Sequence, residues 1–306
     1  FRDISVSDQL FADKNELEKL YHVDFSDMPI AKRLAQINFM IKSRINDYEP
    51  HRQKQIEKSL EINSDYGSSE RKAISRIKVT RELESCRKDI DEICSLDIVS
   101  LYKNLFSDYM VKNMDSDSMP SDIVKFTLEA LDDGLLLYED QAPMLYMMSL
   151  LGMIEPDKKT KHVIIDEAQD YSEAMYKFLF HMYSGSNMAI LGDPRQNINS
   201  YGSIGDLREL NNILNNDLDF LSLSKSYRST QEISEFASHI IKSDYEFFGR
   251  HGMEPTIISS NTLDELAKSV TDYLNNIQSD DFNRIAVICR SAKDCRQIYD
   301  KIKDDL

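Results

Sequence analysis

The sequence predicts an α/β fold, in which a parallel sheet is flanked by helices and preceded by a mostly helical segment. Two observations support this prediction. Over roughly the first hundred residues, apolar side chains recur at helical spacing. Further along, short apolar runs alternate with amphipathic stretches, which is typical of strand–helix–strand units. The chain has 306 residues, 41% of them apolar, which is enough to form two cores and favours two domains.

The helical segment is expected to cover residues 1–115 and to contain an antiparallel hairpin. Asp27 and Pro29 are residue types that start helices, and Pro50 is expected to interrupt the first helix. After a loop at 63–70, apolar residues recur in alternating steps of four and three, which places them on one helix face. These residues are Val79, Leu83, Cys86, Ile90 and Ile93. The charged runs of this segment fit solvated helix faces better than a nucleic-acid contact.

Four apolar runs are the predicted strands. They are HVIID (162–166), MAILGD (188–193), FLSLS (220–224) and RIAVICR (284–290). Each is followed by an amphipathic stretch with a residue suited to cap a helix, such as Ser291 after the last run. We expect a domain junction between the second and third runs, with one α/β portion at 116–204 and another beginning at 205–306.

Composition argues against several classes of protein. Lys and Arg number 37 against 53 Asp and Glu, a net charge of -16, which argues against a globally basic nucleic-acid binder but not against a local basic groove. The four cysteines form no CxxC pair, so we expect free thiols in a reducing cytoplasm rather than a disulfide framework. We found neither an apolar run of membrane-spanning length nor a signal-peptide pattern, so no membrane association is expected.

The segment VIIDEAQD (163–170) carries the first candidate site residues. Val163–Ile165 is predicted to be a buried strand with Asp166 and Glu167 at its carboxyl end, the edge where open α/β sheets bind ligands. An aspartate there is suited to hold Mg²⁺, and the adjacent glutamate to activate a water molecule. The simpler alternative is an acidic loop in which Gln169 and Asp170 cap the next helix.

The segment AILGDPRQNINSY (189–201) repeats the pattern of a strand followed by a polar turn. It brings Asp193 and Gln196 to the same predicted sheet edge. A glutamine amide both donates and accepts hydrogen bonds, so it can sense whether a terminal phosphate is present. The alternative is a Gly-Asp-Pro turn that binds no ligand.

The segment LSLSKSYRSTQEI (221–233) is a third strand exit, with Tyr227 and Arg228 just before a predicted helix. A planar, permanently charged guanidinium suits a phosphate, and a tyrosine ring offers a flat face for a base. Taken alone, the tripeptide Tyr-Arg-Ser (227–229) is more simply explained as the end of an ordinary strand.

Together, DEAQD, GDPRQNI and the YRS segment resemble motifs II, III and IV of the UvrD/Rep-like superfamily 1A DNA helicases, over roughly residues 125–300. The resemblance implies a RecA-like P-loop NTPase fold with ATP and Mg²⁺ as cofactors. It makes residues 1–115 an inserted, 1B-like helical subdomain. Residues 116–204 would be a portion of RecA-like domain 1A, and 205–306 the start of RecA-like domain 2A.

The resemblance also implies roles in ATP hydrolysis. Asp166 would bind Mg²⁺ and Glu167 would activate the hydrolytic water. Gln196, with Asp193 beside it in the nucleotide site, would contact the γ-phosphate and couple it to movement. Arg228 would reach the γ-phosphate from the second RecA-like domain.

Two tyrosines would have stacking roles by the same resemblance. Tyr227 would stack on the adenine, and Tyr201 would stack on bases of single-stranded DNA. The sequence departs from the family near this point, because Asn199 stands where a tyrosine is usual and the common Arg-Gly pair is absent.

A phosphate-binding loop ends in Gly-Lys-Ser/Thr, and none of the nine glycines is followed by lysine. We therefore expect a fragment of a longer polypeptide, with the Walker A loop upstream and motifs V and VI downstream. The 306-residue stretch alone is expected to be inactive as an ATPase.

Three hypotheses about function remain open from the sequence. The first is an ATP-dependent helicase or translocase on single-stranded or partially duplex DNA. The second is a helicase-like ATPase that binds RNA polymerase and remodels or recycles transcription complexes. It is favoured by the acidic charge and by a YED…LLYL-like helix (138–151), which resembles the helicase IV and RNA-polymerase-recycling branch. The third is a degenerate helicase domain that serves as a scaffold.

Overall fold

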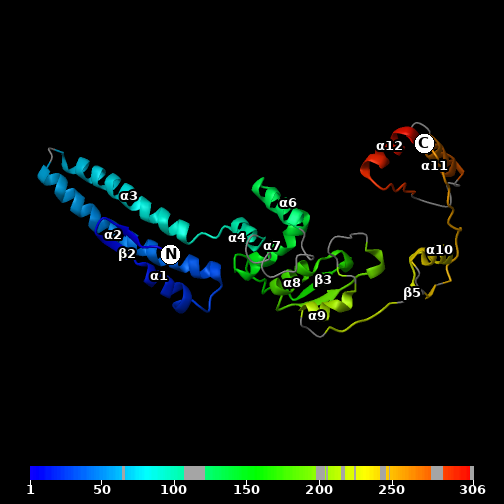
Figure 1. Cartoon of the computed structure of the whole chain (residues 1–306), viewed down its shortest axis with the longest axis horizontal. Coiled ribbons are helices and arrows are strands. Elements are labelled where there is room, and N and C mark those ends of the chain that lie inside the picture. The colour runs from blue at the N-terminus through cyan, green and yellow to red at the C-terminus, as the bar shows by residue number, and fades with distance from the viewer. Residues whose placement is uncertain are drawn as a thin grey trace. The chain divides into compact units, whose positions relative to one another are not determined.

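The structure is a computed structural model of the chain. It describes residues 1–63, 66–106, 121–197, 204, 206–214, 218–223, 225–241, 246–247, 249–276 and 285–303. The protein is mixed α/β and mostly helical (Figure 1). By its internal contacts the chain divides into two compact units, unit one (Phe1–Phe220) and unit two (Leu221–Leu306). Among the described helices, none is both long and apolar enough to cross a membrane.

A helical hairpin dominates the first part of unit one. Helices α2 (Ile30–Asn63) and α3 (Ser68–Ile93) lie side by side and run in opposite directions (Figure 1). The seam between them is fully buried and comprises Ile37, Ile41, Ile45, Val79, Leu83, Cys86 and Ile90. The predicted seam on α3 is confirmed, because steps of four and three residues keep these side chains on one helix face.

Pro50 does not interrupt the first helix, so this part of the prediction was wrong. Helix α2 continues through it, although an internal proline removes one backbone hydrogen bond and costs about 3 kcal/mol. Ion pairs to α3 lie close on both sides of it, with Glu49 2.6 Å from Arg87 and Arg52 2.8 Å from Glu82. Packing along the whole hairpin outweighs this local preference.

A short β-hairpin at the N-terminus was missed by the helical prediction. Strands β1 (Ile4–Val6) and β2 (Gln9–Ala12) pair antiparallel and are followed by α1 (Lys14–Lys19) and the π-helical turn η1 (Leu20–Asp24). Strands of three and four residues are too short to establish a period of two in the sequence. They form here because they pack against the hairpin formed by α2 and α3.

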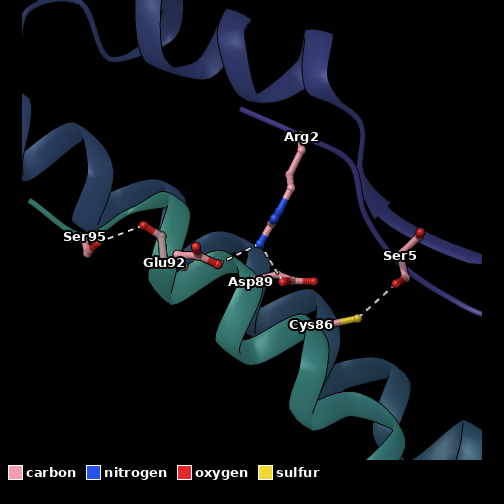
Figure 2. A network of polar contacts seen from close by, with 6 residues as sticks. All are labelled: Arg2, Ser5, Cys86, Asp89, Glu92 and Ser95. Carbon is pink, nitrogen blue, oxygen red and sulfur yellow. Dashed lines mark hydrogen bonds and ion pairs between the residues drawn. The ribbon is translucent and has the colours of Figure 1, made fainter.

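Polar contacts hold the N-terminus against α3, as Figure 2 shows. The Arg2 guanidinium lies 2.7 Å from the Asp89 carboxylate and 2.8 Å from the Glu92 carboxylate. The Cys86 thiol donates a hydrogen bond to the carbonyl oxygen of Ser5 at 3.2 Å. Burial raises the pKa of the Cys86 thiol, and all four cysteines are free, as predicted.

Three helices form a second layer of unit one. They are α4 (Ile98–Asn104), α6 (Ser121–Asp132) and α7 (Tyr138–Leu150), and their shared core includes Tyr102 and Met144. The Tyr102 hydroxyl donates to the Oδ1 atom of Asp140 at 2.9 Å inside this core. The Oδ2 atom of Asp140 is buried and finds no hydrogen-bond partner among the described residues. Burial raises the pKa of the Asp140 carboxyl, although the Tyr102 bond lowers it.

The raised pKa of Asp140 predicts a pH-dependent stability. A carboxyl whose pKa is higher in the folded state favours folding most below its unfolded pKa of about 3.9, and this contribution is lost as the pH rises through the folded pKa. We compare the free energy of unfolding of Asp140→Asn with that of the wild type. The difference, variant minus wild type, is expected to increase as the pH is raised from about 4 to about 7. Urea denaturation at both pH values measures this difference, and parallel pH profiles for the two proteins would contradict it.

The α/β part of unit one begins with two parallel strands. Strands β3 (His162–Ile165) and β4 (Asn187–Ile190) pair in register from His162 with Asn187 to Ile165 with Ile190. Helix α8 (Glu173–Met182) connects them, and α9 (Leu210–Leu214) follows the 3-10 turn η5 (Leu207–Glu209). The core beneath the strand ends consists of Ile165, Ala168, Tyr176, Ile204 and Leu210.

Unit two has its own parallel strand pair and small core. Strand β5 (Lys225–Ser226) pairs with β6 (Glu246–Phe247). Its helices are α10 (Gln231–Ile241), α11 (Leu263–Asn276) and α12 (Ala292–Ile302). The last two share a core of Ala267, Ile298 and Ile302. Ser291 caps α12 as predicted, since its hydroxyl oxygen accepts from the Asp294 amide at 3.1 Å.

Two of the four predicted strands are confirmed, the third is displaced to β5 (Lys225–Ser226), just after FLSLS, and the fourth is wrong. The runs HVIID and MAILGD form β3 and β4, whereas the described residues of FLSLS and RIAVICR are not strands. Leu221 and Ile288 in these runs are 87% and 91% exposed. A strand is stable only when it is paired with a neighbour, and an apolar run does not reveal whether that neighbour is present.

Candidate active site at the ends of two parallel strands

The loops that follow β3 and β4 are joined at one edge of the sheet. Both strands end at the same level, because Ile165 pairs with Ile190. The Leu191 amide donates to the Ile165 carbonyl oxygen at 2.8 Å, and the Ala168 amide donates to the Leu191 carbonyl oxygen at 2.9 Å. The acidic pair that begins at Asp166 therefore lies against the loop after β4, as the sequence predicted.

The acidic pair has an unusual backbone conformation. Glu167 has φ 49° and ψ 42°, in the left-handed region, which costs a residue other than glycine about 1–3 kcal/mol. The Asp166 carboxylate accepts a hydrogen bond from the Glu167 amide at 2.9 Å. Both side chains are exposed. A ligand can therefore reach both carboxylates. The contacts around the loop hold its backbone in this conformation.

Gln169 links the two loops through its side chain. It is only 1% exposed, its Nε2 atom donates to the Glu167 carboxylate at 2.7 Å, and its Oε1 atom accepts from the Asp193 amide at 3.0 Å. The sequence suggested this residue only as a helix cap. Its position in an otherwise polar segment gave no indication of burial, so sequence reasoning missed its role.

The residues beneath the loops that follow β3 and β4 are tightly packed. Ala168 and Tyr176 are fully buried, and the Tyr176 hydroxyl donates to the Ala168 carbonyl oxygen. A Cβ atom at Gly192 would lie 2.8 Å from the Oε1 atom of Gln169 and 3.1 Å from the Ala168 backbone nitrogen. Only glycine lets the loop after β4 approach the acidic pair this closely.

The loop after β4 holds Gln196 beside Asp193. Asp193 precedes the 3-10 turn η4 (Pro194–Gln196), and its carboxylate accepts from the Arg195 amide at 3.0 Å. Its other oxygen accepts from the Nε2 atom of Gln196 at 3.0 Å. Hydrogen bonds therefore run without a break from Glu167 through Gln169 to Asp193 and Gln196. The structure brings together four of the five site residues predicted in unit one, namely Asp166, Glu167, Asp193 and Gln196.

The strand carrying the acidic pair is only partly buried. Ile165 is 5% exposed, but Ile164 is 73% exposed, so the prediction of a buried strand at Val163–Ile165 was wrong for one face. A shallow hollow beside β3 is lined by Ile164, Asp166 and Tyr171 among others. Successive side chains of a strand point to opposite faces, so the face with Ile165 is covered and the face with Ile164 is open.

The remaining predicted site residues lie elsewhere. Tyr227 and Arg228 belong to unit two, where they are exposed and connect β5 to α10. Their convergence with the acidic pair stays a prediction. Tyr201 lies outside the described residues.

The residues present at the strand ends suit a magnesium nucleotide. Mg²⁺ is usually bound by one or two carboxylates together with phosphate oxygens and water. The exposed Asp166 offers such a carboxylate, and the described residues contain no cluster of three or more His, Cys, Asp or Glu that would form an all-protein cage. Glu167, next to it, offers a carboxylate that can accept a proton from water.

Comparison with known families identifies the chain. Residues 12–212 match the family model of the UvrD/REP helicase N-terminal domain, a span that includes the α2–α3 hairpin, β3, β4 and the loops with Glu167 and Gln196. A comparison with curated proteins found no match. Because the matched residues make up well over half of the chain, the chain belongs to the UvrD/REP helicase family.

Proposed function

We propose that this chain is the central part of an ATP-dependent superfamily 1 DNA helicase or translocase that couples ATP hydrolysis to movement along single-stranded DNA. Family membership supports a helicase-type function. The observation that carries the specific proposal is the hydrogen-bonded connection from Glu167 to Gln196 at one sheet edge. It joins a candidate base to a candidate phosphate sensor.

In this proposal the residues of unit one have distinct roles. Asp166 holds the magnesium ion, which supplies neutralisation of phosphate charge when it is bound. Glu167 accepts a proton from the attacking water. Gln196 responds to the γ-phosphate, and Asp193 orients the Gln196 amide through the 3.0 Å bond.

The proposal gives three further residues roles that rest on the resemblance of their motifs to those of the helicase family. Arg228 stabilises charge on the γ-phosphate, Tyr227 stacks on the adenine, and Tyr201 stacks on single-stranded DNA. The proposed helical insertion covers 1–115, the 1A portion 116–204 and the start of domain 2A 205–306, although the residues up to Phe220 belong to unit one by their contacts.

The charged runs of the α2–α3 hairpin, which the sequence alone assigned to solvated helix faces, are assigned by the proposal to a nucleic-acid contact. Residues 52–81 contain eight Lys and Arg against four Asp and Glu, although the whole chain has a net charge of -16. Lys54 and Lys58 on α2, and Lys72 and Arg76 on α3, are exposed pairs spaced four residues apart, so each pair lies on one helix face. Local positive charge of this kind binds phosphate backbones.

The test uses the full-length protein. We expect ATP hydrolysis that is stimulated by single-stranded DNA, and displacement of a strand from a partial duplex. A variant with Lys54, Lys58, Lys72 and Arg76 replaced by Glu should bind single-stranded DNA more weakly, with a shallower dependence of affinity on salt, because each phosphate contact contributes about 0.7 to the slope. Its ATPase rate without DNA should be unchanged. Absence of DNA-stimulated hydrolysis in the wild type would overturn the proposal.

The alternative is a helicase-like ATPase that binds RNA polymerase and remodels or recycles transcription complexes. The net charge of -16 favours it, because this charge argues against a globally basic nucleic-acid binder. A pull-down of RNA polymerase alongside the strand-displacement assay separates the two. Retention of the polymerase without strand displacement would favour the alternative.

A further inference from the structure

We propose that Gln169 is a positioning residue for ATP hydrolysis. Its amide holds the Glu167 carboxylate and ties that carboxylate to the Asp193 loop. The inference rests on the proposed ATPase function and adds to it a residue that neither touches nucleotide nor transfers a proton.

The chemistry of the bridge requires an amide. Gln169 donates through Nε2 to a carboxylate at 2.7 Å and accepts through Oε1 from a backbone amide at 3.0 Å. An amide side chain supplies a donor and an acceptor at once, whereas a carboxylate supplies acceptors only. Because the side chain is 1% exposed, water cannot readily replace either bond, and losing one would leave a buried polar group unsatisfied.

The Glu167 carboxylate needs such a restraint. Its side chain is exposed, so packing alone does not select one rotamer. A general base is effective only where its oxygen meets the water that it deprotonates, and a displacement of about 1 Å can lower a rate about 100-fold. The bond from Gln169 fixes one carboxylate oxygen and leaves the other free.

The same bridge makes the position of Glu167 depend on the loop after β4. Gln169 bonds to the backbone amide of Asp193, and the Asp193 carboxylate accepts from Gln196 at 3.0 Å, so two residues separate the candidate base from the candidate phosphate sensor. The contact at Gly192, whose added Cβ would lie 2.8 Å from the Gln169 Oε1 atom, leaves little room for the bridge to move alone. A shift of this loop is therefore transmitted to Glu167.

The first test is Gln169→Leu in the full-length protein, which keeps most of the side-chain volume and removes both bonds. We expect kcat for ATP hydrolysis to fall about 10- to 100-fold, with KM for ATP changed less than about threefold. Gln36→Leu, the same change on the exposed surface of α2, is the matched control and should leave kcat unchanged. Circular dichroism establishes that both variants are folded.

The second variant, Gln169→Glu, gives a result that a purely structural role would not produce. At high pH the introduced carboxylate repels Glu167, whereas at lower pH one proton shared by the two carboxyls restores a donor. We expect kcat relative to the wild type to rise about tenfold as the pH falls from about 8 to about 6. This variant decides the question if Gln169→Leu does not fold.

The outcomes separate the two proposals. If the wild type hydrolyses ATP and Glu167→Gln does not, the proposed function stands. Wild-type kcat in Gln169→Leu, or a pH profile of Gln169→Glu parallel to that of the wild type, would then overturn the role of Gln169 alone. A full-length wild type without ATPase activity would instead refute the proposed function.

Discussion

Replacing Glu167 by Gln in the full-length protein is expected to abolish ATP turnover while sparing nucleotide binding. The amide has nearly the same shape as the carboxylate but cannot accept a proton from water. Loss of a general base lowers a rate by about 10²- to 10⁴-fold. The new carbonyl oxygen can still accept from Gln169, whose Nε2 atom lies 2.7 Å from the carboxylate, so the loop geometry should persist.

The measurement pairs steady-state ATPase kinetics with equilibrium binding of a fluorescent nucleotide. Glu173→Gln is the matched control, because Glu173 lies in the first turn of α8 and forms an exposed ion pair with Lys177. It should retain wild-type kcat. Turnover that survives in Glu167→Gln would mean that a different group deprotonates the water.

The largest loss of stability is expected for Ile41→Ala. Ile41 is fully buried in the seam between α2 and α3, and truncating a buried isoleucine to alanine costs about 2–5 kcal/mol through lost burial and the cavity left behind. Denaturant titration monitored by circular dichroism measures the change in the free energy of unfolding.

Ile62→Ala on the same helix provides the comparison. Ile62 is 81% exposed, and an exposed substitution of this kind usually changes stability by less than about 0.5 kcal/mol. Both variants replace an isoleucine of α2 by alanine and leave the net charge unchanged. Equal effects at the two positions would show that the seam does not stabilise the hairpin as the structure indicates.

Features that depend on local spacing were predictable from the sequence. The steps of four and three from Val79 to Ile90 place four side chains on one face of α3, and all four are fully buried. Equally, carboxyl ends of neighbouring parallel strands share one edge, so the approach of Asp166 to the Asp193 loop followed from the strand–turn patterns. Family membership confirms a helicase-type relationship for the motifs up to Gln196.

Features that depend on what surrounds a segment were not predictable. Pro50 has a strong local preference to end a helix, yet contacts between α2 and α3 carry the helix through it. The strands β1 and β2 form through packing against the hairpin. Conversely, the apolar runs near Leu221 and Ile288 have strand-like composition but are not strands in the described residues.

By itself, the sequence determined the α/β class and the seam of the helical hairpin. It also determined that Glu167, Gln196 and Arg228 each follow an apolar run, because all these features depend on spacing along the chain. Only the tertiary structure decided that Gln169 is buried and bonded to both Glu167 and Asp193. The physical reason is that burial and hydrogen-bond partners 24 residues apart depend on how β3 and β4 pair. The shared edge of two parallel strands followed from their sequence patterns, whereas the packing of a side chain of one loop against the other loop has no local pattern.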